Sequence, residues 1–104
     1  MQQTVSTKAE LLEIVRDSSE AIRALGVVRL RLFGSFVRSE QKDSSDVDFL
    51  VDFQQGKKTF DHLMDLGFLL EEKLQRRVEL VTSESLNKRL KPVVLAEAED
   101  VPLS

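Results

Sequence analysis

The chain has 104 residues, a net charge of −3 and no cysteine. This length suits one domain with a single modest core and is short for a catalytic domain plus a dedicated substrate domain, so we expect one domain over residues 1–104. The lack of cysteine excludes disulfides and thiolate metal sites and fits the cytoplasm, and the mild charge argues against nucleic acid as the main partner. No apolar run approaches membrane-spanning length and the first residues lack a secretory-signal pattern, so we expect no membrane association.

An amphipathic helix is predicted from about Thr7 to Leu25. Thr7 and Glu10 have the spacing of a capping box, in which each side chain satisfies a free backbone N–H of the first turn. Apolar residues then recur at helical spacing, which predicts one buried helix face. They are Leu11, Ile14, Val15, Ala21, Ile22 and Leu25.

Residues 27–33 are predicted to form the first strand. Side chains alternate along a strand, so Arg29 and Arg31 share one face. The apolar side chains expected on the other face are those of Val28, Leu30 and Leu32.

The next two predicted strands carry acids in the same alternation. The second, residues 47–53, places Asp48 and Asp52 opposite its apolar side chains, and we expect Asp52 to be a surface acid rather than a ligand. The third, residues 77–81, carries Glu79 in the corresponding phase. One apolar and one charged sheet face indicate helices packed on one side only.

The predicted fold class is α+β, with a small mixed sheet and helices on one face. Only about ten residues separate the first two strands, which is short for a parallel crossover, so a brief helix and an antiparallel or mixed pairing are expected. A second long helix is predicted over residues 59–74. A last helical region begins near Ser83 and is divided by Pro92, because proline is excluded from a helix interior but fits a first turn.

The candidate site combines a small turn with three acids. Gly34 and Ser35 end the first strand and begin a helix, where backbone N–H groups and the helix dipole favour an anion. Asp46 and Asp48 follow ten residues later, about 7 Å apart along one strand face, and Glu79 lies on a later strand. Three carboxylates beside a phosphate-sized turn suit metal-dependent transfer from a nucleoside triphosphate.

Two structural interpretations compete with this one. Arg29 and Arg31 point to the same face and could form cross-strand ion pairs with Asp46 and Asp48, leaving no free acid. The glycine and serine could form an ordinary turn and helix cap.

Two segments carry a family resemblance. Residues 32–38 (LFGSFVR) and 45–51 (SDVDFLV) resemble the DNA polymerase beta-like nucleotidyltransferase superfamily. The chain looks most like its minimal nucleotidyltransferases, small proteins often paired as antitoxins with helical HEPN-domain toxins. The likeness extends over nearly the whole chain.

The resemblance implies roles for six residues. Two aspartates and a third acid bind divalent metal and carry out catalysis, and the turn with a following arginine holds the triphosphate. Mapped here, these residues are Asp46, Asp48 and Glu79 for the metal, and Gly34, Ser35 and Arg38 for the nucleotide. The third acid is usually aspartate, so Glu79 departs from the pattern, as do Ser39 and Val37, where glycine and alanine are common.

The resemblance also implies an activity. Two Mg²⁺ ions would assist transfer of AMP, or another nucleoside monophosphate, from ATP to a hydroxyl of a partner protein, plausibly a tyrosine of a HEPN-type toxin that is thereby neutralised. An alternative is an antitoxin with weak catalysis that masks its partner by binding. A third is transfer to a small molecule such as an aminoglycoside, although such members usually carry a further domain. The oligomeric state stays open, a homo-oligomer included.

Overall fold

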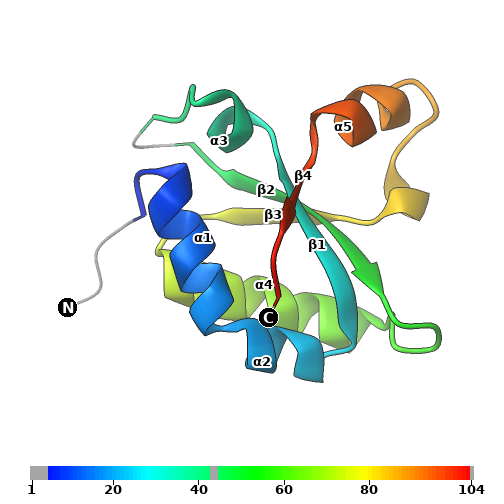
Figure 1. Cartoon of the computed structure of the whole chain (residues 1–104). Helices are drawn as coiled ribbons and strands as arrows, with labels where there is room; N and C mark the ends of the chain where they lie inside the picture. The colour runs from blue at the N-terminus through cyan, green and yellow to red at the C-terminus, as the bar shows by residue number, and fades with distance from the viewer. Residues whose placement is uncertain (1–4, 43–44, 104) are drawn as a thin grey trace.

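Four strands form one mixed sheet in the order β3-β2-β1-β4 (Figure 1). β1 is antiparallel to both β2 and β4, whereas β2 is parallel to β3. The structure is a computed structural model that describes residues 5–42 and 45–103. The strands are β1 (Val27–Phe33), β2 (Val47–Phe53), β3 (Val78–Val81) and β4 (Glu99–Val101).

Three helices cover one face of this sheet and form the core with it. They are α1 (Lys8–Asp17), α2 (Ser19–Ala24) and α4 (Phe60–Leu74). Their buried leucine, isoleucine and valine side chains pack on the apolar side of β1 and β2. The predicted α+β class, with a mixed sheet covered on one side, is confirmed. The other side carries most of the charged strand residues, and we call it the charged face. They are Arg29, Arg31, Asp48, Asp52, Glu79 and Asp100.

Three short helical segments lie outside this core layer. They are α3 (Ser35–Arg38), the 3₁₀ turn η1 (Ser83–Ser85) and α5 (Lys91–Glu97). α3 is the brief helix predicted between the first two strands. Pro92 lies in the first turn of α5, so the predicted division of the last helical region is confirmed. None of the helices in residues 5–42 and 45–103 is long and apolar enough to cross a membrane.

The first predicted helix begins where expected, but the prediction of one continuous helix is wrong, because the segment forms two helices, α1 and α2. The capping box of Thr7 and Glu10 is present, and the second long helix likewise begins after a Thr59 cap. At Ser18 the backbone leaves helical geometry (φ −100°, ψ 6°), which separates α1 from α2. Ser18 and Ser19 are buried, and serine side chains readily bond to nearby backbone groups in place of a continuous helix.

The face assigned to Val28 is also corrected. Val28 is 61% exposed, and Val27 occupies the core position instead at 3% exposure. A β-bulge between Val27 and Arg29 inserts an extra residue opposite β2 and shifts the alternation. Leu30 and Leu32 lie in the core as predicted.

The C-terminal strand β4 was not predicted, because its three residues include two acids. β4 pairs with β1 through Leu32 and Glu99, Arg31 and Asp100, and Leu30 and Val101. The end of α5 is therefore brought beside the end of β1, where the glycine-serine turn lies.

Candidate active site

Asp48 and Glu79 form a carboxyl pair on the charged face. They are direct neighbours in the parallel register of β2 and β3. Partial burial, followed by the negative charge of Glu79 and a hydrogen bond between the two carboxyl groups, raises the pKa of Asp48 to about 6. The charge of Asp46 adds to this rise in pKa, and Arg38 opposes it. Asp48 therefore keeps its proton to a higher pH than an isolated aspartate does.

Asp46 lies just before β2 and acts on Asp48 through its charge. Its place is fixed by the neighbouring backbone, since the Val47 N–H donates to the Arg77 carbonyl at 2.9 Å. As the side chains are positioned, no three acidic or histidine side chains within the described residues meet closely enough to hold an ion. The structure thus shows two of the predicted acids in contact and the third on the adjoining loop.

Arg76 positions that loop, and no motif in the sequence pointed to it. Its side chain is buried, and its Nη1 donates to the carbonyls of Lys42 (3.0 Å) and Ser45 (2.9 Å). Its guanidinium also lies over the Phe36 ring, 5.1 Å from the centroid, so it connects α3 with the segment that ends at Asp46. The carbonyls of Val5, Lys42 and Ser45 accept from Arg76, and backbone acceptors leave no pattern in the sequence.

The glycine-serine turn lies against the carboxyl pair. Gly34 has a φ of +84°, and a Cβ atom at this position would collide with Oδ2 of Asp48. Only glycine allows both this conformation and this approach. The Gly34 carbonyl accepts from the N–H groups of Val37 (3.1 Å) and Arg38 (3.3 Å), which begins α3 with Ser35 as its first residue.

A glutamate that sequence reasoning missed occupies the turn. The Gly34 N–H donates to Glu97 Oε1 at 2.5 Å, and Arg38 Nη1 donates to Glu97 Oε2 at 2.8 Å. Arg38 Nε donates to Glu40 at 2.5 Å as well. Glu40 and Glu97 together raise the pKa of Arg38, so this guanidinium is a fixed positive charge.

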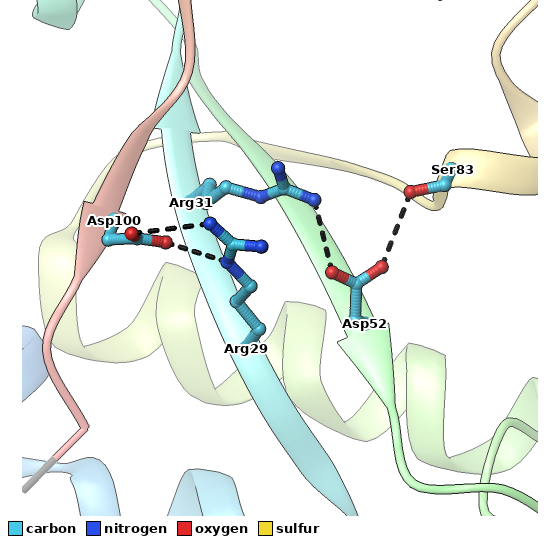
Figure 2. A network of polar contacts seen from close by, with 5 residues as sticks. All are labelled: Arg29, Arg31, Asp52, Ser83 and Asp100. Atoms are coloured by element: carbon cyan, nitrogen blue, oxygen red, sulfur yellow. Dashed lines mark hydrogen bonds and ion pairs between the residues drawn. The ribbon is translucent and has the colours of Figure 1, made fainter. Parts of the chain in front are cut away.

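The two strand arginines pair with other acids, as Figure 2 shows. Arg31 Nη2 donates to Asp52 at 3.1 Å, and Asp52 also accepts from Ser83 at 3.3 Å. Arg29 donates to both carboxylate oxygens of Asp100 at 2.8 and 3.3 Å.

The competing ion-pair interpretation is therefore not what this structure contains. Within residues 5–42 and 45–103, no ion pair joins Arg29 or Arg31 to Asp46 or Asp48. Asp52 is bonded to Arg31 and Ser83 instead, and that it is not a metal ligand stays a prediction.

Comparisons with known proteins agree with this architecture. The model of the nucleotidyltransferase domain family matches residues 8–101. A protein of Methanocaldococcus jannaschii named as a candidate protein adenylyltransferase is 43% identical over 89 residues, which cover 86% of this chain and 95% of that protein. Protein adenylyltransferase MntA of Thermococcus cleftensis is 37% identical over 92 residues, which cover 88% and 92%.

Solved structures share the fold. A candidate minimal nucleotidyltransferase matches with a TM-score of 0.69 and 39% identity over 85% of this chain and 93% of that one. A toxin-antitoxin structure with AMP-PNP matches with a TM-score of 0.66 over 90% of this chain and 71% of that one, and its 21% identity shows fold alone. This chain belongs to the nucleotidyltransferase domain family, and within that family it is a minimal nucleotidyltransferase.

Proposed function

We propose that the chain transfers AMP from ATP to a hydroxyl of a partner protein, with Mg²⁺ bound by Asp46, Asp48 and Glu79. The observation that carries this proposal is the Asp48 and Glu79 carboxyl pair directly beside Gly34. Two acids that repel each other suit metal ions, and a glycine backbone beside them allows a triphosphate to approach closely.

The acids present fit such a metal. Burial and the neighbouring acids Glu79 and Asp46 raise the pKa of Asp48, and a bound divalent cation would offset the cost of its negative charge. Carboxylate oxygens are the ligands that Mg²⁺ prefers in proteins, and it usually completes its shell with water and substrate phosphates. Bound Mg²⁺ would supply positive charge for the phosphate oxygens in the transition state.

Each residue then has a role in the transfer. Gly34, Ser35 and Arg38 would hold the triphosphate by backbone N–H, hydroxyl and guanidinium donors. The acceptor oxygen would bond to the α-phosphorus while the bond to the bridging oxygen breaks and pyrophosphate leaves. Glu79 lies on edge strand β3 and is exposed, so it would receive the acceptor's proton at a place that a macromolecule can reach.

The names of the relatives support the acceptor class. The Thermococcus cleftensis relative is named a protein adenylyltransferase, and two structures with this fold come from toxin-antitoxin pairs. We extend this to a toxin as the acceptor, of HEPN type, with ATP as donor. Modification would then neutralise the toxin.

The test is transfer of label from α-labelled ATP to a HEPN-type toxin, with Mg²⁺ and with EDTA. Label on the toxin with Mg²⁺ alone is the expected result. Neutralisation of the toxin without any label would contradict transfer and favour masking.

Masking is the second candidate because α4 offers an apolar surface. Phe60, Met64 and Phe68 are 74%, 40% and 60% exposed and lie at intervals of four residues on one helix side. Such a stripe suits contact with another protein. Charged substitutions at Phe60 and Phe68 should weaken contact with the partner and leave ATP binding intact, because α4 covers the face of the sheet opposite the acids (Figure 1).

A further inference from the structure

Glu97 reaches the glycine-serine turn because of where β4 pairs. β4 begins with Glu99 paired to Leu32, so Glu97, the last residue of α5, comes close to Gly34, which lies two residues beyond Leu32. Its carboxylate accepts from the Gly34 N–H with one oxygen and from Arg38 with the other. Glu97 lies more than 50 positions in sequence from both Gly34 and Arg38, so the fold brings these residues together.

The two donors that Glu97 occupies are ones that the proposed function assigns to the triphosphate. A carboxylate and a phosphate group both accept charge-assisted hydrogen bonds from backbone N–H and guanidinium donors. The Gly34 N–H has one hydrogen and can serve one of these acceptors at full strength. Glu97 also offsets the positive charge of Arg38, which would otherwise attract an anion.

We propose that Glu97 is a further residue of the nucleotide site, whose carboxylate occupies the position of a phosphate group in the free protein and is displaced when the nucleotide binds. This inference rests on the proposed function. It assigns Glu97 the role of an internal competitor that sets the affinity for ATP.

The surroundings allow the displacement. None of the residues of α5 is buried, and the Glu97 side chain is 22% exposed. A rotation of this side chain toward water would free both donors without moving β4. The observed dissociation constant is the intrinsic one divided by the fraction of molecules in which the site is free, so a site that Glu97 occupies about nine times in ten binds roughly tenfold more weakly.

The test is the affinity for Mg²⁺-ATP, measured by calorimetry, for the wild type and three variants. Glu97→Gln removes the charge, so its amide competes poorly, and affinity should tighten by roughly three- to tenfold. Glu97→Asp keeps the charge but is one methylene shorter and cannot reach both donors, so affinity should tighten to an intermediate value. Glu40→Gln is the matched control, because Glu40 pairs with the same arginine without touching Gly34, and the change should stay below about twofold.

Each outcome decides the proposal. Tightening in both Glu97 variants, but not in Glu40→Gln, supports it. Weaker ATP binding by Glu97→Gln would show that Glu97 supports the turn. Tighter ATP binding by Glu97→Gln, with no change in Glu97→Asp, would show a general effect of charge. Either result overturns the proposal. Equal binding by the wild type and Glu97→Gln overturns this inference alone, whereas absence of binding in all four proteins overturns the proposed function with it.

Discussion

The charged face has two halves that differ in charge balance. Around β1, Arg29 and Arg31 are each paired with a carboxylate, Asp100 of β4 and Asp52 near the end of β2. Between the start of β2 and β3, Asp48 lies against Glu79 and near Asp46, and burial and like charges raise the pKa of Asp48. We call these the paired half and the acidic half.

The difference separates structural from chemical use of the same residue type. A carboxylate with a fixed arginine partner already has its hydrogen bonds and countercharge, so it has little to gain from a ligand. A carboxylate held against another acid costs stability and gains most from a cation. The following predictions test that division, from the largest expected effect to the smallest.

Removing charge from the acidic half should abolish transfer. Asp46→Asn with Asp48→Asn deletes two metal ligands and keeps side-chain size, so transfer should fall by about 10³-fold or more, since several kcal/mol of transition-state stabilisation are lost. Label transferred from α-labelled ATP measures the effect. Asp52→Asn in the paired half is the matched control and should keep most of the activity; equal losses in both variants would erase the distinction.

Adding a side chain at the turn should disturb the acidic half sterically. Gly34→Val forces a β-branched residue to a φ of +84° and directs its Cβ into Asp48, so ATP affinity should fall by about a hundredfold, or ~2.7 kcal/mol. Calorimetry with Mg²⁺ measures it. Gly56→Val is the control, because Gly56 has a similar φ of +82° with no atom within 4 Å of an added Cβ. Similar ATP affinity in both variants would mean that the turn does not hold phosphate.

Deleting one hydroxyl should have a smaller effect on the same affinity. Ser35→Ala removes one hydrogen bond to a charged phosphate, which is worth ~1.5–3 kcal/mol, so affinity should fall at least roughly tenfold. Ser83→Ala is a matched control, because Ser83 bonds to Asp52 in the paired half. Unchanged ATP affinity in Ser35→Ala would place the triphosphate elsewhere.

The same substitution should change stability in opposite directions in the two halves. The folded-state pKa of Asp48, about 6, lies above its ordinary value of 3.8, so the folded protein binds more protons and its free energy of unfolding falls as pH rises from about 4 to above 6. Asp48→Asn should therefore stabilise the metal-free protein at pH 7.5, by on the order of 1 kcal/mol after allowance for solvent screening, and this gain should vanish at pH 4. Asp52→Asn should destabilise by about 1–2 kcal/mol, because it leaves Arg31 without its carboxylate.

Urea unfolding in EDTA at both pH values measures these changes. Destabilisation by Asp48→Asn at pH 7.5 would mean that the carboxyl pair is a net stabilising contact.

Local patterns predicted much of this molecule. The capping box at Thr7, the alternation around Asp48 and the position of Pro92 were all correct because each depends on neighbours in sequence. The break at Ser18 and the bulge at Val28 were missed, since both arise where tertiary packing overrides a regular pattern.

The site shows the same limit. Alternation placed Asp48 and Glu79 on one face, and the spacing to Gly34 indicated the turn. These local patterns could not reveal Glu97 or Arg76, because the partners of both side chains include backbone groups more than 30 positions away in sequence. A strand as short as β4 has almost no sequence signal, and its register is what brings Glu97 to the site.

The buried guanidinium of Arg76 has a consequence for motion. It bonds to the Val5 carbonyl at 2.5 Å as well as to the loop before Asp46, and the Val5 N–H donates to Leu74 at the end of α4. The segment before α1, the loop that leads to β2 and the end of α4 are thus connected through one side chain. Local opening of any one of them breaks bonds of the others, so their amide protons should exchange with solvent as a single cooperative unit.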